Sequence, residues 1–158
     1  MSSAVLTSPS VERVREALSR AGLADTIVEL PGAARTARAA ADYLGCDIGQ
    51  IANSLVFRAS ERPLLVMSSG AKRVDLARLA TLAGEPVGKA DAEFVRRHTG
   101  FVIGGVAPVG HGLARTFVEK SLAAYPELWA AAGHPHTVFR LSYRELVRIT
   151  GGAEVDLA

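Results

Sequence analysis

The stretch IGGVAPVGH, from Ile103 to His111, is rich in residues that can hold an unusual backbone next to a ligand. Glycine adopts conformations that a Cβ forbids, while proline fixes φ and has no N–H to donate. A loop of this composition can present backbone N–H groups to a ligand as fixed hydrogen-bond donors. The same composition marks a tight loop between two elements, so both interpretations stay open.

Other chemistries find less support in the sequence. His134 and His136 share a turn, but no HExxH or CxxC spacing accompanies them, so we interpret them as solvated and expect no metal. No Gly-Lys-Ser/Thr ending follows the glycines, which argues against a Walker-type phosphate loop. No GxSxG motif occurs, and the sequence SSG at residues 68–70 is interpreted as a polar turn rather than a nucleophile site.

The length of 158 residues predicts one domain, residues 1–158, with a core of ordinary size. A net charge of +2 permits nucleic-acid binding without indicating it, because a solvated basic surface gives the same value. Cys46 is the single cysteine, so no intramolecular disulfide can form. No secretory signal and no membrane-spanning apolar run are found, so we expect a cytoplasmic protein and no membrane partner.

The elements that must position the loop follow from apolar spacing and from capping residues. Helices are predicted at residues 9–21, 37–44, 75–82, 92–97 and 143–150. Strands are predicted at residues 26–30, 51–58, 63–68, 115–118, 128–132 and 137–141. The second and third strands are expected to form a hairpin with a turn of about five to six residues. Strands and helices alternate irregularly, which predicts an α/β fold of the α+β type: one mixed central sheet surrounded by short helices.

The start of the second helix carries a charge of the wrong sign. Thr36 is expected to be its N-cap, and Arg35 and Arg38 flank it. A helix N-terminus favours anions, so either the two arginines are solvated or something negative binds there.

Four stretches in fixed order resemble the YbaK/EbsC family, the free-standing relatives of the editing domain of bacterial prolyl-tRNA synthetase. They lie at residues 36–45, 50–58 (QIANSLVFR), 69–76 (SGAKRVDL) and 99–111, and residues 150–155 also fit. The likeness extends from about residue 25 to 157. Each piece alone is weak, but the set in order is specific.

The resemblance implies hydrolysis of the ester between a wrong amino acid and the 3′-terminal ribose of a tRNA, without metal or organic cofactor. The glycine loop would hold the ester, and water would attack it while preorganised donors stabilise the oxyanion. The expected catalytic residues are Asn53, Gly104, Gly105, Val106, Ala107, Pro108 and Gly110. The expected substrate-binding residues are Thr36, Ser69, Gly70, Lys72, Arg73 and His111. His111 is either a pocket residue or a hydrogen-bonded anchor of the loop.

One departure from the family pattern concerns Asn53, which stands where relatives carry a lysine. Losing a charge-assisted hydrogen bond costs about 1.5–3 kcal/mol. Lys72 or Arg73 either replaces the missing charge or is simply a surface residue at a helix start. A second and milder departure is Glu119, where relatives often have aspartate.

The expected partner is therefore the 3′-terminal adenosine end of an aminoacyl-tRNA, with no DNA partner and with a monomer as the default. Two alternatives remain. The first is a protein of the same fold that binds the tRNA end without catalysis, which Asn53 favours. The second is a small-molecule binding module, which only the loop supports.

Overall fold

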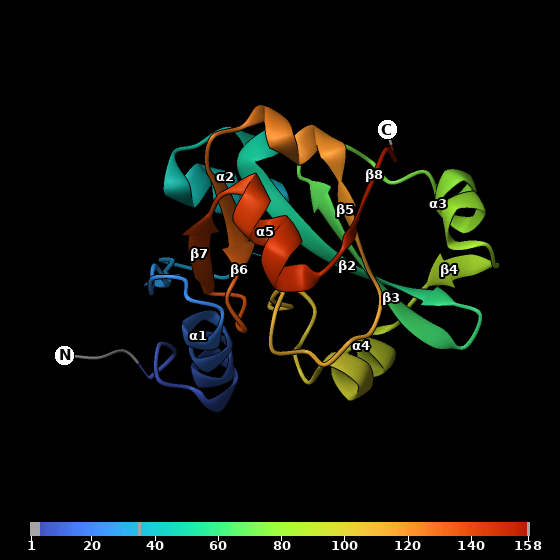
Figure 1. Ribbon diagram of the computed structural model, residues 1–158. Helices are drawn as coiled ribbons and strands as arrows, with labels where there is room; N and C mark the ends of the chain where they lie inside the picture. Colours follow the sequence, from blue (N-terminus) through green and yellow to red (C-terminus); the bar gives the residue numbers. More distant parts are fainter. Residues whose placement is uncertain (1–3, 35, 158) are drawn as a thin grey trace.

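The computed structural model describes residues 4–34 and 36–157 and contains one mixed sheet with helices on both faces (Figure 1). The strands are β1 Val28–Glu29, β2 Ile51–Ala59, β3 Arg62–Ser69, β4 Val87–Lys89, β5 Thr116–Glu119, β6 Leu128–Ala131, β7 Thr137–Leu141 and β8 Ala153–Val155. Their order in the sheet is β1-β7-β6-β2-β3-β5-β8, with β4 paired to β2. The predicted α+β architecture is confirmed.

The helices begin within one residue of the predicted positions, the one difference being Asp75, which is an N-cap rather than a helical residue. They are α1 Pro9–Arg20, α2 Ala37–Leu44, α3 Leu76–Ala83, α4 Ala92–Thr99 and α5 Tyr143–Thr150, with 3-10 turns at Ile48–Gln50 and Lys120–Ala124. The Thr36 hydroxyl accepts from the Ala39 N–H at 3.1 Å, and Ser142 and Glu145 form a capping box. Each cap satisfies backbone donors that the first helical turn leaves without partners.

The hairpin of β2 and β3 is the centre of the sheet, and its turn is shorter than the sequence predicts. Ala59 pairs with Arg62, so only Ser60 and Glu61 lie between the strands, and Ser60 has a φ of 53°. The Gly70 N–H donates to the Ile51 carbonyl at 2.8 Å, which makes the odd-numbered residues of β2 the ones bonded to β3. Pro63 pairs with an even-numbered residue, so β2 does not need the N–H that proline lacks.

Two strands were not predicted, because each has three residues and little apolar pattern. β4 pairs antiparallel with the end of β2, and β8 pairs parallel with β5. The edge of β2 that faces away from β3 pairs with two different strands, one at each end of β2, and the residues between these two pairings have no neighbouring strand. β6 pairs with Ile51 and Ala52, and β4 pairs with residues 57–59.

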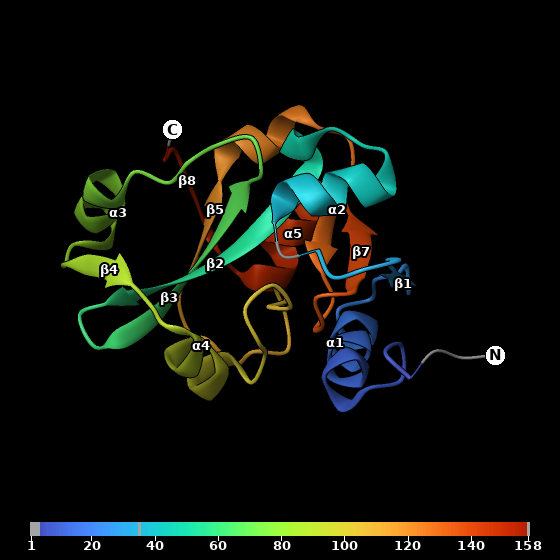
Figure 2. The same cartoon turned by 180° about the vertical axis from the view of Figure 1, so that it is seen from behind.

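Apolar side chains fill both faces of the sheet. Leu65 and Met67 face one core, together with residues of α1, α4 and α5. Leu64 and Val66 face the other core, beside Leu79 of α3. Helix α2 covers the end of β2 on the face opposite α5 (Figures 1 and 2).

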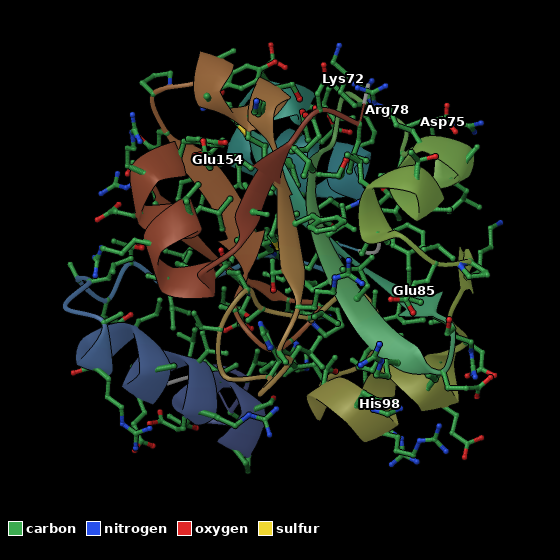
Figure 3. All side chains as sticks on the ribbon, turned by 45° about the vertical axis from the view of Figure 1, so that its right-hand side comes forward. Lys72, Asp75, Arg78, Glu85, His98 and Glu154 are labelled. Carbon is green, nitrogen blue, oxygen red and sulfur yellow. The ribbon has the colours of Figure 1, made fainter. Side chains whose placement is uncertain are left out.

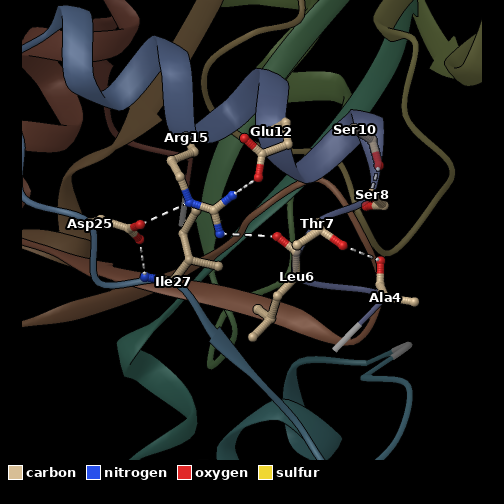
Figure 4. Close-up of polar contacts among 9 residues, drawn as sticks. All are labelled: Ala4, Leu6, Thr7, Ser8, Ser10, Glu12, Arg15, Asp25 and Ile27. Carbon is tan, nitrogen blue, oxygen red and sulfur yellow. Dashed lines mark hydrogen bonds and ion pairs between the residues drawn. The ribbon is translucent and has the colours of Figure 1, made fainter. Parts of the chain in front are cut away.

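Helix α1 is held by Arg15, which connects it to the segments before and after it (Figure 4). The Arg15 side chain pairs with Glu12, donates from Nη2 to the Leu6 carbonyl at 3.1 Å, and donates from Nε to Asp25 at 2.8 Å. The second oxygen of Asp25 accepts from the Ile27 N–H at 3.1 Å. With α1 fixed, the Arg13 guanidinium lies 4.3 Å from the ring centroid of Phe101, just before the glycine loop.

Within residues 4–34 and 36–157, no helix is both long and apolar enough to cross a lipid bilayer.

Candidate functional site

A pocket opens where β2 lacks a neighbouring strand, and we call it the main pocket. It measures about 480 Å³ including its open mouth. Residues from five segments line it: Ala34, Thr36, Ala37, Ala40, Ile51, Ala52, Asn53, Ser54, Gly104, Val106, Trp129, Ala131, Pro135, Thr137 and Val138. Asn53, Thr36 and two residues of the glycine loop therefore share one cavity, as the resemblance implies.

The glycine loop, residues 103–110, presses against the turn that precedes β7. A Cβ at Gly105 would lie 2.9 Å from the Cα of His134, a distance that real Cβ atoms do not reach. Gly104 has space for a Cβ, but its φ is 89°, which side chains other than glycine rarely adopt. The two glycines are thus required for different reasons, close approach at Gly105 and conformation at Gly104.

Several backbone donors of the loop lack an acceptor among the described residues. The Gly105 N–H donates to the Val102 carbonyl at 2.9 Å and closes a turn. Val106 and Ala107 are buried, at 3% and 0% exposure, yet neither N–H finds an acceptor within the described part of the chain. Buried N–H groups without partners are rare in proteins. Val106 also lines the main pocket, so this unpaired N–H belongs to a residue of the cavity wall.

His111 fixes the far end of the loop from both sides of its ring. Its Nε2 lies 2.8 Å from the Pro108 carbonyl, and its Nδ1 accepts from the Leu113 N–H at 2.9 Å. Accepting at Nδ1 and donating at Nε2 requires the neutral ring. Burial lowers the pKa of His111, which agrees with this assignment. The structure therefore places His111 as the anchor of the loop and outside the lining of the pocket.

We predict that His111→Gln lowers the free energy of unfolding by about 1–3 kcal/mol, because buried partners lose their hydrogen bonds. The lowered pKa of His111 means that the unfolded chain binds more protons below the ordinary value of 6.5. Stability is therefore fully present above that pH and is lost as the pH falls below it. Urea unfolding at pH 7.5 and 5.5 measures both effects. An equal loss of stability in wild type and variant between these pH values would contradict the role of His111.

Asn53 lies on the wall of the main pocket with its side chain half-buried. Its amide forms no hydrogen bond within the part of the chain that the structure describes. The side chain next along the strand is engaged, since the Ser54 hydroxyl lies 3.4 Å from the sulfur of Met67. Asn53 thus offers an uncommitted donor and acceptor to whatever occupies the cavity.

Ser69 and Gly70 do not line the main pocket, because both are packed against neighbouring segments of the chain. The Ser69 hydroxyl donates to the Gly49 carbonyl at 2.9 Å and accepts from the Ala71 N–H at 3.3 Å. A Cβ at Gly70 would lie 2.6 Å from the Cβ of Ala37. Ser69 therefore joins the end of β3 to the 3-10 turn before β2, and Gly70 allows the loop after β3 to pack closely against α2.

Lys72 and Arg73 are exposed and do not line the pocket. Figure 3 shows Lys72 pointing outward at the end of the molecule where Arg78 lies. Arg38 is likewise exposed on α2, whereas Arg35 lies outside the described residues. No charge replaces the family lysine inside the cavity among the residues described.

The remaining loop residues support the site from behind. Ala107 and Pro108 are buried outside the pocket lining, and Gly110, with a φ of 77°, packs on Arg13 and Phe101. The residues that the sequence analysis missed are mainly Trp129 and Ala131 of β6, Pro135 of the turn, and Thr137 and Val138 of β7. Their only sequence signal is the single tryptophan in a short strand.

The histidine pair in the turn is engaged locally. The rings of His134 and His136 lie 5.2 Å apart, and the His134 Nδ1 accepts from the His136 N–H at 3.0 Å. In residues 4–34 and 36–157, no group of three or more His, Cys, Asp or Glu side chains is placed to hold a metal ion.

Comparison with known proteins gives a consistent result. The model of a family described as the aminoacyl-tRNA editing domain matches residues 32–149. A structure described as a candidate trans-editing enzyme for prolyl tRNA synthetase is 43% identical, with a TM-score of 0.88 over 95% of this chain and 97% of that chain. A structure from work on epitope backbone grafting onto scaffold proteins is 41% identical, with a TM-score of 0.89 over the same shares. The uncharacterized protein YwhH of Bacillus subtilis (strain 168) is 26% identical over 141 residues, 87% of this chain and 88% of that protein.

Proposed function

The chain belongs to the aminoacyl-tRNA editing domain family, and from this premise we propose that it hydrolyses the ester of a mischarged tRNA in trans. The resemblance to YbaK-type editing domains that the sequence indicates is confirmed by the family match and by the related structure.

The observation that carries the proposal is the pair of free donors at Val106 and Ala107, buried beside the pocket that Asn53 lines. Water would attack the ester carbonyl, and the developing oxyanion would accept from the Val106 N–H. The bond between the carbonyl carbon and the ribose oxygen then breaks, and that oxygen takes a proton from the attacking water. This route requires no serine or cysteine nucleophile.

Asn53 would orient the ester or the water through its amide. Its lack of charge supports the second candidate, a protein that binds the tRNA end without catalysis. The two candidates differ in one observable, since a protein of the second kind binds charged tRNA and leaves the rate of ester loss unchanged.

The test is the release of amino acid from a panel of mischarged tRNAs, with binding measured in parallel. Hydrolysis of at least one member above the spontaneous rate supports the deacylase. Binding without hydrolysis supports the second candidate. Neither hydrolysis nor binding at physiological salt would overturn both, and would favour a small-molecule ligand.

Exposed basic residues near α2 would contact tRNA phosphates. We predict that Lys72→Ala and Arg73→Ala each weaken tRNA binding about fivefold and reduce the salt dependence by about one counterion. The turnover number should not change, because neither side chain lines the pocket.

Filter binding at several salt concentrations measures this, with Arg144→Ala on α5 as the control, since α5 lies on the face opposite α2 (Figures 1 and 2). A fall in turnover number with unchanged binding would show instead that one of these residues replaces the charge missing at Asn53.

A further inference from the structure

The interrupted edge of β2 leaves hydrogen-bonding groups uncovered in the middle of the sheet. Pairing with β6 ends at Ala52, and pairing with β4 begins at Phe57. Odd-numbered residues of β2 bond to β3, so the backbone groups of Ser54 and Val56 point to the open edge. In Figures 1 and 2, β6 and β4 lie at opposite ends of β2.

Two of these groups form a recognisable pair. The Ser54 carbonyl and the Val56 N–H have no backbone partner on this edge within the described residues. A carbonyl at one position and an N–H two residues later lie side by side on the same edge of a strand. The edge therefore presents one acceptor beside one donor.

A second pocket covers this edge, and we call it the apolar pocket. It measures about 550 Å³ including its open mouth. Val56, Val95, Ile103 and Val106 supply its apolar walls, and Ala90 closes it on the side of β4. Ile103 is 56% exposed, so its side chain is accessible at the rim of this pocket.

The apolar pocket adjoins the main pocket. Ser54 and Val106 line both cavities, so a ligand held in one reaches the other across Val106. An apolar side chain in the apolar pocket would bury the Ser54 carbonyl and the Val56 N–H without partners, which costs binding free energy. A flat base with a donor next to an acceptor would use both and would pack between the apolar walls.

We propose that the apolar pocket binds the terminal adenine base of the tRNA. The N6 amino group donates to the Ser54 carbonyl, N1 accepts from the Val56 N–H, and the ribose crosses Val106 so that the ester lies in the main pocket. This inference rests on the proposed function for the position of the ester. It adds a subsite that reads the last of the three bases, CCA, that the 3′ ends of all tRNAs share.

The experiment measures binding of uncharged RNA hairpins that end in CCA, so it does not depend on hydrolysis. The terminal adenosine is replaced by 1-deazaadenosine, which lacks the N1 acceptor, or by guanosine, which inverts donor and acceptor. We expect affinity to fall about tenfold for the first and about 100-fold for the second. Equal affinity for the adenosine and guanosine ends would overturn the proposal, as would failure of every hairpin to bind.

Two protein variants localise the effect. Ile103→Ala removes a wall of the apolar pocket and should weaken binding of the adenosine-ended hairpin about fivefold. Leu82→Ala, an exposed apolar side chain on α3 outside both pockets, is the matched control and should have no effect. Unchanged affinity in Ile103→Ala would contradict the assignment.

The outcomes separate this subsite from the proposed function. Adenine-dependent binding without ester hydrolysis would retain the base pocket and overturn the deacylase. Ester hydrolysis with equal binding of adenosine and guanosine ends would retain the deacylase and overturn the base pocket.

Discussion

Replacing Gly105 by alanine is expected to lower the rate of ester hydrolysis by about 100-fold, because a catalytic group displaced by about 1 Å costs that much. The added Cβ would meet the His134 backbone at 2.9 Å, and backbone atoms cannot rotate aside as a flexible side chain does. The loop must therefore move away from the turn and carry the Val106 donor with it. Crowding should also lower the free energy of unfolding by about 1–3 kcal/mol.

Single-turnover hydrolysis at a temperature where the variant stays folded separates these two effects. Gly88→Ala is the matched control, because nothing lies within 4 Å of the added Cβ and Gly88 lines neither the main pocket nor the apolar pocket. A Gly105→Ala variant that hydrolyses the ester as fast as Gly88→Ala would exclude the glycine loop from the reaction.

Asn53→Ala is expected to slow hydrolysis about tenfold, the usual effect of losing one hydrogen bond and leaving its partner unpaired. Stability should stay the same, because the Asn53 amide bonds to no other described residue. Asn53→Lys restores the lysine of the family pattern. It should raise the rate about tenfold, since a hydrogen bond from a charged donor is roughly twice as strong as one from a neutral donor. The small side chains of alanines at 34, 37 and 40 line the cavity beside Asn53.

Rates of the three proteins on one mischarged tRNA, together with their urea unfolding curves, measure these effects. Activity in Asn53→Lys alone would identify the natural protein as a binding descendant of an editing enzyme. Equal rates in wild type and Asn53→Ala would remove Asn53 from the mechanism.

Local chemistry explains how much of the fold the sequence predicts. Thr36, Asp91 and Ser142 cap helices through contacts within a few residues, so their helices were located correctly. β4 and β8 form because β2 and β5 offer them an edge to pair with. Three residues without a clear apolar pattern cannot indicate such pairing. The turn between β2 and β3 was predicted to be too long, because paired strand residues next to it include the charged Arg58 and Arg62, which resemble turn residues in the sequence.

The candidate site likewise contains residues that the sequence predicts and residues that only the folded sheet brings to it. The loop and Asn53 were predicted from composition and resemblance, and the structure brings Gly104, Val106 and Asn53 to one cavity. Trp129 reaches that cavity through parallel pairing with Ile51, a contact between distant parts of the chain. The open edge at Ser54 is a property of the whole sheet and has no sequence signal.

The most direct test of the central claim is single-turnover ester hydrolysis, with the wild-type protein in excess over each mischarged tRNA of a panel and Gly105→Ala as the inactive control. We predict that at least one aminoacyl ester is lost faster with wild type than in buffer, and that Gly105→Ala removes about 99% of that acceleration. Loss of every ester at the spontaneous rate with the folded wild-type protein would contradict the claim.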